Sequence, residues 1–246
     1  MPERKVEIPM RGGSSDGFLY CPEGDGRWPG ILYLTDIGGI RPANREAAAR
    51  LAKEGYAVLM PNVFYRTGRT PLQPPIRSLS GEAAKQRFAE LAQPLTPESM
   101  EEDDSTYIAF LKSQDCVRNG MMGVVGYCFT GKMAMHAAAR CPDAIAAVAS
   151  FHGGGLFTDA PTSPHLTLPR IKARLYFAHA TDDHSMPEEA IAKLEQALES
   201  WGGKYESETY KGAHHSWTSS DSPVYNPPQA ERAFQKLLKL LKETLG

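Results

Sequence analysis

Features that would mark a nucleic-acid-binding, membrane or secreted protein are missing from this sequence. It has no block of basic residues, and its 27 Lys and Arg against 29 Asp and Glu give a formal net charge of −2. That balance gives no electrostatic reason to bind nucleic acid or an anionic membrane surface. No apolar run approaches the roughly 18 residues of a membrane span, and residues 1–7 lack the apolar segment of a secretory signal. We therefore expect neither nucleic acid nor membrane as a partner.

Cysteine is also scarce. The chain has four, Cys21, Cys116, Cys128 and Cys141, and none of them forms a C-x-x-C pair or shows the spacing of a metal site. Isolated cysteines of this kind are typical of a reducing compartment, so we predict free thiols and a cytoplasmic protein. All except Cys128 are predicted to be buried as small apolar side chains.

Histidines and acidic residues are not grouped for metal binding. His179, Asp182 and His184 lie near one another in the sequence, but they give no compact ligand set with the spacing of a metal site. We therefore predict a protein with neither a metal nor another cofactor.

What the chain does have is a regular alternation of two patterns. Short apolar, β-branched runs predict strands, and the segments between them have helical spacing. The predicted strands are residues 30–34, 56–60, 123–126, 146–150, 174–179 and 205–210. Such alternation indicates an α/β protein with a mostly parallel central sheet and helices on both faces. The length of 246 residues suits a single domain over residues 1–246.

The predicted helices have recognisable ends. Residues 43–53 and 188–201 are each followed closely by glycine, the usual residue just past a helix. The last helix is predicted to begin after Asn226, an N-cap residue. Residues 67–99 break the alternation, and we predict that they form an excursion that helps shape the rim of an active site.

The most informative stretch is GYCFTG, residues 126–131, which lies between a predicted strand and a segment rich in alanine. A strand that turns sharply into a helix, with a nucleophile at the tip and small neighbours, is typical of the nucleophile elbow of α/β-hydrolases. Gly126, two positions before the nucleophile, leaves room for the tight turn. Cys128 is therefore the predicted nucleophile.

A cysteine nucleophile needs a base, and the base needs a group that orients it. In α/β-hydrolases the three follow in the order nucleophile, acid, histidine, each on a loop after a strand. After the fifth predicted strand come Asp182 and Asp183, and after the sixth come His214 and His215. Both loops follow the carboxyl ends of strands, where ligands bind in open α/β sheets. The pattern leaves open which member of each pair acts.

The combination resembles the dienelactone hydrolase family, which pairs a G-x-C-x-x-G elbow with an Asp four residues before a Pro and a histidine after a Tyr-x-Gly-Ala-x loop. Asp183 precedes Pro187 by four residues, and the loop from Tyr210 leads to His215. The resemblance spans roughly residues 30–217. It implies the α/β-hydrolase fold and a cofactor-free hydrolase of carboxylic ester bonds, which cleaves a small ester or lactone as carboxymethylenebutenolidases do.

The resemblance also implies a role for each site residue. Cys128 attacks the carbonyl carbon and forms an acyl-enzyme, His215 takes the thiol proton and later activates water, and Asp183 holds the imidazole. The backbone N–H groups of Ile37 and Phe129 form the oxyanion hole, which stabilises the charge that develops on the carbonyl oxygen.

Three positions depart from the family pattern. Asp36 stands where the family has a glutamate that engages the resting thiol, and its side chain is one methylene shorter. Thr130 stands where the elbow usually has glycine, and Ser219 stands where family members place an arginine on a substrate carboxylate. The residues predicted to contact substrate are Arg66, which would replace that arginine as an anion contact, and Tyr127, His152 and Trp217.

Two other classes of function stay open. A non-catalytic small-molecule binding protein on the same fold is favoured by Asp36 and Thr130, since either residue would blunt the thiol. A thiol redox sensor would use Cys128, with Cys21 or Cys116 as its resolving cysteine. The composition gives no reason to expect an obligate assembly, so we predict a monomer or a weak homodimer.

Overall fold

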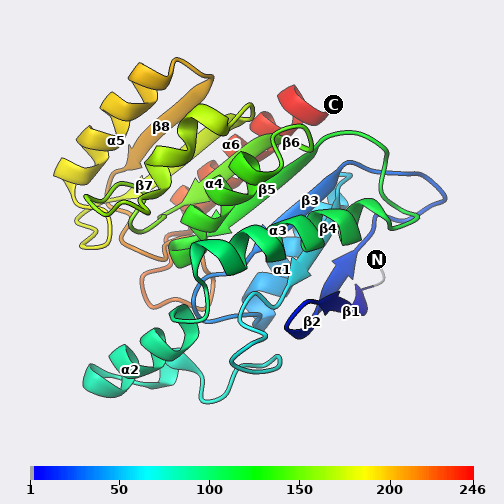
Figure 1. Ribbon diagram of the computed structural model, residues 1–246, viewed down its shortest axis with the longest axis horizontal. Coiled ribbons are helices and arrows are strands. Elements are labelled where there is room, and N and C mark those ends of the chain that lie inside the picture. Colours follow the sequence, from blue (N-terminus) through cyan, green and yellow to red (C-terminus); the bar gives the residue numbers. More distant parts are fainter. Residues whose placement is uncertain (1–2) are drawn as a thin grey trace. The chain divides into compact units, whose positions relative to one another are not determined.

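The chain divides between Asn119 and Gly120 into two units. The computed structural model describes residues 3–246, and Figure 1 shows its helices and strands coloured along the chain. Each unit contributes four strands. That residues 1–246 act as one domain stays a prediction.

The first unit combines an antiparallel hairpin with a parallel pair of strands. β1 (Glu3–Met10) pairs with β2 (Gly13–Tyr20), and β2 pairs with β4 (Ala57–Pro61), both in antiparallel orientation. β3 (Gly30–Leu34) runs parallel to β4, and α1 (Pro42–Lys53) is the crossover that a parallel pair requires. β3 has its predicted bounds, and β4 is shifted by one residue.

The sequence did not predict the hairpin of β1 and β2. β1 begins with charged residues, and only from Val6 onward is every second side chain buried. β2 begins with Gly, Ser and Asp, and glycine and aspartate are depleted in strands; most of its buried side chains lie in its second half. Pairing with the neighbouring strands, rather than local preference, makes these residues strands.

The segment that breaks the alternation is partly helical. It contains the 3₁₀ turn η1 (Ile76–Ser78) and α2 (Gly81–Ala92), and α3 (Pro97–Lys112) begins at its end. Thr96 caps α3, because its hydroxyl oxygen accepts a hydrogen bond from the backbone N–H of Ser99 at 3.2 Å. The predicted place of this segment at an active-site rim stays a prediction.

Two of the four cysteines form a disulfide. Cys21 and Cys116 are 95 residues apart in sequence, and the fold brings their Cα atoms to 6.2 Å with the sulfurs bonded. The prediction that both are free, buried thiols is therefore wrong, because pairing over such a separation depends on the fold and leaves no local signal. Cys128 and Cys141 are free and half-buried. Without four free thiols the cysteines no longer argue for a reducing compartment, and the cytoplasmic location stays a prediction.

Arg66, a predicted anion contact, is held by an acidic residue of α3. Its guanidinium donates two hydrogen bonds to Asp103, at 2.5 and 3.0 Å, and the Tyr65 hydroxyl donates a third at 3.0 Å. Asp103 is 1% exposed. Removal of Arg66 would therefore leave a buried carboxylate without its opposite charge. The pair gives Arg66 a structural role, and its contact with substrate stays a prediction.

Asp104, the next residue of α3, is buried without such a partner. It is fully buried, and neither carboxylate oxygen has a hydrogen-bond partner in the part of the chain that the structure describes. Burial raises the pKa of the Asp104 carboxyl well above its usual range, and the charge of Asp103 adds to the effect. The fold therefore favours the neutral, protonated form of Asp104.

Replacing Asp104 by asparagine is expected to stabilise the protein in a pH-dependent way. Above about pH 4 the unfolded chain releases the Asp104 proton while the folded chain retains it, so wild-type stability falls as pH rises towards the raised pKa of Asp104. Asparagine does not titrate, so D104N should gain about 1–3 kcal/mol of unfolding free energy at pH 8 and little at pH 4. Urea unfolding at both pH values measures this, with the exposed Asp115→Asn as control. If D104N gained the same unfolding free energy at pH 4 and pH 8, the conclusion that folded Asp104 is protonated would be contradicted.

The four strands of the second unit all run parallel to one another. Its strands follow in the order β5 (Met122–Tyr127), β6 (Ile145–Phe151), β7 (Arg174–Ala180) and β8 (Tyr205–Tyr210), each parallel to the next. All four strands contain the runs predicted from the sequence. Because the strands are parallel, the loops after them lie at one edge of the sheet, where side chains from distant parts of the sequence come together.

Helices cover both faces of these four strands. α4 (Gly131–Arg140) follows β5 and lies in front of the strands in Figure 1, whereas α6 (Pro227–Leu245) lies behind them. α5 (Glu188–Trp201) connects β7 to β8 and has its predicted bounds. Asn226 caps α6 as predicted and accepts a hydrogen bond from the backbone N–H of Gln229 at 3.3 Å. Within residues 3–246, no helix is long and apolar enough to cross a membrane.

Candidate active site

Cys128 lies at the tip of a sharp turn between β5 and α4. Its backbone φ of 56° lies in the left-handed region, which residues with side chains rarely adopt. The turn is so tight that a Cβ on Gly126 would lie 2.3 Å from the carbonyl oxygen of Thr130. A single 3₁₀ turn, η2 (Cys128–Thr130), then leads into the helix. This local geometry is that of a nucleophile elbow.

Thr130 fits the elbow because its hydroxyl closes the turn. Oγ1 accepts a hydrogen bond from the backbone N–H of Tyr127 at 2.9 Å and donates one to the Tyr127 carbonyl at 3.0 Å. The residue is fully buried. A threonine in place of the usual glycine is therefore compatible with the strained conformation of Cys128 and adds two hydrogen bonds to it.

The start of α4 packs closely against the loop after β6. A Cβ on Gly131 would lie 2.3 Å from Ser150 Oγ and 2.9 Å from Gly153 Cα, so only glycine permits this approach. The backbone N–H of Gly154 donates a hydrogen bond to the carbonyl of Cys128 at 3.2 Å. These contacts hold the elbow against a second loop of the same edge.

Asp183 faces His215 from the loop after β7. One carboxylate oxygen lies 2.6 Å from His215 Nδ1, and the other accepts hydrogen bonds from the N–H and hydroxyl of Ser185 at 2.9 and 2.7 Å. Burial alone would raise the pKa of Asp183, but the hydrogen bond and charge of His215, with the bonds from Ser185, lower it to about 2. Asp183 is therefore ionised at neutral pH.

His215 contacts both Asp183 and the side chain of Cys128. Burial lowers the pKa of its imidazole, but hydrogen bonds to Asp183 and Cys128, together with the charges of both, raise it to about 10. Nδ1 is engaged by Asp183, which leaves Nε2 for the sulfur. The imidazole therefore carries a proton on each nitrogen at neutral pH.

The structure also separates the residues that competed for these roles in the sequence. Asp182 and His214 are exposed, whereas Asp183 is 7% exposed and bonded to His215. The structure thus brings together Cys128, Asp183 and His215.

Three predicted substrate contacts form an aromatic cluster with His215. The ring of His152 lies 5.0 Å from that of His215, 5.1 Å from that of Trp217 and 6.1 Å from that of Tyr127. His152 Nε2 is 2.8 Å from the hydroxyl of Thr218. Because His152 and Trp217 are 1% and 0% exposed, the cluster supports the histidine loop from within. Contact of these rings with substrate stays a prediction.

Asp36 is engaged by two arginines of its own unit. Arg41 donates a hydrogen bond to each carboxylate oxygen at 2.9 Å, and Arg77 reaches one of them at 3.4 Å. Burial would raise the pKa of Asp36, but the bonds and charges of these arginines lower it. With both oxygens bonded, Asp36 is a charged partner of Arg41. That Asp36 engages the Cys128 thiol stays a prediction. That the backbone N–H of Ile37 lines an oxyanion hole also stays a prediction.

Sequence reasoning missed three side chains at this site. Ser185 follows Asp183 by two residues, a spacing at which a backbone N–H commonly bonds an Asp side chain, so it was detectable. Lys132 was also detectable, because it follows Cys128 by four residues, about one helical turn. Its Nζ lies 4.0 Å from the ring centroid of Phe129. Thr218 has no local signal, because its contact depends on the fold.

No group of His, Cys, Asp and Glu within residues 3–246 could hold a metal ion. His179, one of the histidines weighed as a ligand, is 2% exposed, and its Nε2 lies 3.2 Å from Ser207 Oγ. Burial lowers the pKa of His179 to about 4, so the ring is neutral at neutral pH. Its contact with Ser207 joins the neighbouring strands β7 and β8.

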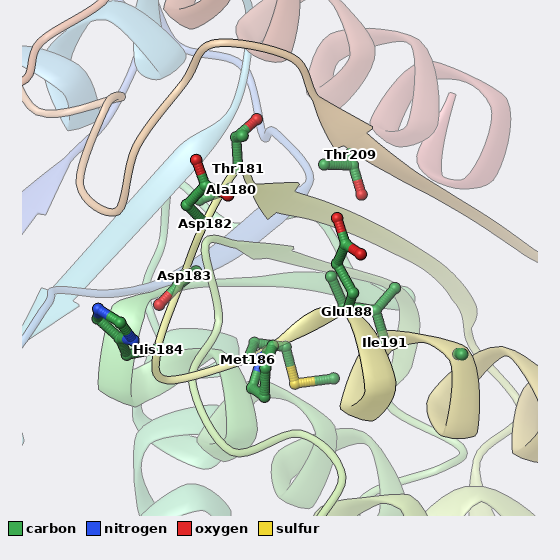
Figure 2. A pocket seen from close by; sticks show the side chains of 11 residues that line it. Ala180, Thr181, Asp182, Asp183, His184, Met186, Glu188, Ile191 and Thr209 are labelled. Atoms are coloured by element: carbon green, nitrogen blue, oxygen red, sulfur yellow. The ribbon is translucent and has the colours of Figure 1, made fainter.

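A pocket of about 560 Å³ lies beside the acid loop (Figure 2). In Figure 2 the side chains of Met186, Glu188 and Thr209 are among those that line it, and the carboxylate of Glu188 points towards Thr209. Of the three predicted catalytic residues, Asp183 lines this pocket and Cys128 and His215 do not. The lining residues are Ala180, Thr181, Asp182, Asp183, His184, Met186, Pro187, Glu188, Ile191, Ala192 and Thr209.

Comparisons with known proteins place this chain in a family. The sequence profile of the Dienelactone hydrolase family matches residues 15–245. The carboxymethylenebutenolidase of Rhodococcus opacus is 30% identical over 214 residues, which cover 87% of this chain and 79% of that protein. A Synechocystis protein, provisionally named a carboxymethylenebutenolidase, is 28% identical over 98% of this chain and 96% of its own.

A solved structure shares the fold over the whole length. It is that of a provisionally named dienelactone hydrolase of Klebsiella pneumoniae, with a TM-score of 0.86, 20% sequence identity and coverage of 98% of both chains. The predicted fold class is thereby confirmed. This chain belongs to the dienelactone hydrolase family, and it is a hydrolase on the α/β-hydrolase fold.

Proposed function

We propose that this protein hydrolyses a small ester or lactone with Cys128 as nucleophile, His215 as general base and acid, and Asp183 as the group that orients His215. The observation that carries the proposal is the position of His215, which bonds to Asp183 through Nδ1 and to the side chain of Cys128. In this arrangement His215 lies between the group that orients it and the proposed nucleophile.

In the first half-reaction the Cys128 thiolate attacks the carbonyl carbon, and the carbonyl π electrons move to the oxygen. We propose that the backbone N–H of Phe129, in η2, stabilises that oxyanion together with the backbone N–H of Ile37. The tetrahedral intermediate then collapses to a thioester. The C–O bond to the alcohol breaks, and the leaving oxygen takes the proton that His215 holds.

In the second half-reaction water attacks the thioester. His215, now neutral, accepts a proton from the water, and the hydroxide oxygen bonds to the acyl carbon. The C–S bond breaks, the acid leaves, and the thiolate is restored beside an imidazolium. Asp183 stays ionised throughout, since its pKa of about 2 lies far below neutral pH, and it stabilises each charged form of His215.

The names of relatives suggest the kind of substrate. The Rhodococcus opacus enzyme is named for a carboxymethylene-substituted butenolide, an unsaturated five-membered lactone. A Bradyrhizobium relative, 26% identical over 96% of this chain, is named as a probable lactonase of an oxofuranylidene propanoate. We propose that small lactones of this class, together with simple esters, are the substrates of this chain.

The alternative of a thiol redox sensor has lost support. It needs a resolving cysteine for Cys128, and both candidates, Cys21 and Cys116, are already bonded to each other. Cys141 is free and half-buried, but it lies past the far end of α4.

Purified protein should hydrolyse 4-nitrophenyl butyrate and at least one unsubstituted butenolide, and alkylation with iodoacetamide should remove both activities in step with labelling of Cys128. Peptide mapping identifies the labelled residue and separates it from Cys141. Full hydrolysis after complete labelling of Cys128 would contradict the proposal. No hydrolysis across the panel would favour the binding-protein alternative.

A further inference from the structure

His215 lies at the corner of a strained turn. The backbone N–H of Trp217 donates a hydrogen bond to the carbonyl of His214 at 3.0 Å, which closes a four-residue turn. Ser216 has a backbone φ of 77°, in the left-handed region that glycine and asparagine adopt more readily than serine. Strain of this kind persists only where the surrounding structure holds it. The turn therefore needs anchors outside its own residues.

The bond to Asp183 does not fix the His215 ring on its own. Asp183 engages Nδ1 at 2.6 Å, but a hydrogen bond at one nitrogen leaves the ring free to tilt about that contact. The side chain of His215 is also 29% exposed, so part of it faces solvent. The ring of His152 packs against it edge to face, with 5.0 Å between the ring centroids and 64° between the ring planes. His152 is thus a second support for the imidazole.

His152 also holds the turn at two points beyond His215. Its Nε2 lies 2.8 Å from the hydroxyl of Thr218, the first residue after the turn. Its ring lies edge to face with the Trp217 indole, at 5.1 Å and 70°. Trp217 is fully buried and stacks on Tyr210 at 5.1 Å. Its indole N–H has no hydrogen-bond partner in the part of the chain that the structure describes, so packing against these rings is what holds the indole.

The backbone of His152 is strained as well. Its φ of 40° lies in the left-handed region, and the residue is 1% exposed. Its backbone N–H donates a hydrogen bond to the carbonyl of Ala178 in β7 at 2.7 Å. Glycine or asparagine would fit this backbone with less strain, so the backbone alone does not account for a histidine here. What the imidazole adds is its contact with His215, Trp217 and Thr218.

We propose that His152 is the positioning residue of the general base, because its ring and its bond to Thr218 hold the turn so that His215 Nε2 faces Cys128. The inference rests on the proposed function, since it concerns the same base and the same nucleophile. In this role His152 does not touch the reacting atoms. It limits the motion of the ring that does, and a displacement of about 1 Å in such a group costs about 100-fold in rate.

Two other roles for His152 would give different results. If it contacts the substrate, its loss raises KM and leaves the reactivity of Cys128 toward a small alkylating reagent unchanged. If it only fills space, its loss lowers the free energy of unfolding and leaves kcat of the folded protein unchanged. Positioning predicts a loss in kcat together with a loss in alkylation rate, since both depend on where the His215 ring lies.

Three variants separate the backbone, the ring and the hydrogen bond. His152→Asn introduces a residue that tolerates the left-handed backbone but is too short to reach Thr218. His152→Phe keeps a ring and removes the nitrogens, and Thr218→Val removes only the hydroxyl. The matched control is His165→Asn. His165 also bonds a hydroxyl through a ring nitrogen, that of Ser163 at 2.7 Å, and stacks on Phe157 at 4.0 Å.

H152N should lower kcat for 4-nitrophenyl butyrate about 100-fold, with KM within about threefold of wild type. It should also slow alkylation of Cys128 by iodoacetamide at pH 7 at least about fivefold, measured by peptide mapping. H152F and T218V should each lose about tenfold in kcat. The double variant H152F/T218V should lose about as much as H152F, since both changes remove the same bond. H165N should stay within about twofold of wild type in both measurements.

His215→Ala, in which the base is absent, is the reference for the alkylation rate. If alkylation is unchanged in H215A, the proposed function fails. If alkylation slows in H215A but not in H152N, the inference about His152 fails. A kcat of H152N within about threefold of wild type, or equal losses in H152N and H165N, would also overturn it.

Urea unfolding of each variant ensures that rates are compared on folded protein. If H152N does not fold, T218V decides in its place, because it changes one hydroxyl of a half-buried side chain. A kcat of T218V within about twofold of wild type would then overturn the proposal, whereas a loss of about tenfold with unchanged KM would support it.

Discussion

Replacing Cys128 by alanine should lower kcat/KM for 4-nitrophenyl butyrate by at least about 10⁴-fold, to the level of the uncatalysed background or just above it. The variant removes the nucleophile, and the remaining groups can only stabilise the attack of water, as they do in other hydrolases that have lost a triad member. Alanine has no atom beyond Cβ, so the strained turn at φ 56° is retained. Circular dichroism should show unchanged secondary structure.

Two further variants make this result specific. Cys141→Ala removes the other free cysteine and should keep activity within about twofold. Cys128→Ser retains the elbow with a poorer nucleophile at neutral pH, so we expect a folded protein with weak activity. A C128A protein with substantial activity would contradict a nucleophilic role for this residue.

His215→Ala should lower kcat/KM by at least about 10³-fold while leaving the fold intact. His215 holds the proton that the leaving alcohol needs, and its pKa of about 10 keeps that proton in place at neutral pH. As pH rises through about 10 this proton is lost, so the imidazolium that activates Cys128 in the proposed mechanism is present only below that value. Alkylation of Cys128 at pH 7 should therefore also be slower in H215A.

The neighbouring His214 is the matched control for this prediction. It is exposed, and His214→Ala should keep activity within about twofold. Added imidazole should restore part of the activity of H215A, since it can enter the space that the side chain leaves. A structural role for His215 would predict destabilisation without rescue, and equal losses in the two variants would contradict the assignment.

The sequence predicted the second unit better than the first. β6 and β7 carry continuous apolar runs, as strands covered on both faces do, and glycine ends α5 clearly at Gly202. The hairpin β1–β2 was missed because β2 depends on its neighbours for its conformation. In the last helix, helical spacing predicts a buried face made of Ala230, Phe234, Leu237, Leu238, Leu241 and Leu245. In α6 three of these, Ala230, Phe234 and Leu238, are half-buried, and the buried residues are Ala233, Leu237, Leu240, Leu241 and Leu245.

The candidate triad could be found from the sequence because each member follows a strand and stands in a recognisable motif. Pairing between distant residues could not be found in this way. The Cys21–Cys116 disulfide, the ion pair of Arg66 with Asp103, and the engagement of Asp36 by Arg41 all depend on how the first unit folds. The two ion pairs matter for the predicted roles. Arg66, predicted to contact substrate, is bonded to Asp103, and Asp36, predicted to act on the Cys128 thiol, is bonded to Arg41.

Rapid quenching of the wild-type protein with 4-nitrophenyl acetate, followed by mass spectrometry of its peptides, tests the central claim most directly. A cysteine hydrolase that works through an acyl-enzyme should show one acetyl group on the Cys128 peptide during turnover, released by neutral hydroxylamine as a thioester is, and no acetyl group on the corresponding peptide of C128A. Turnover with no acyl group on Cys128, or with the acyl group on another residue, would contradict the account.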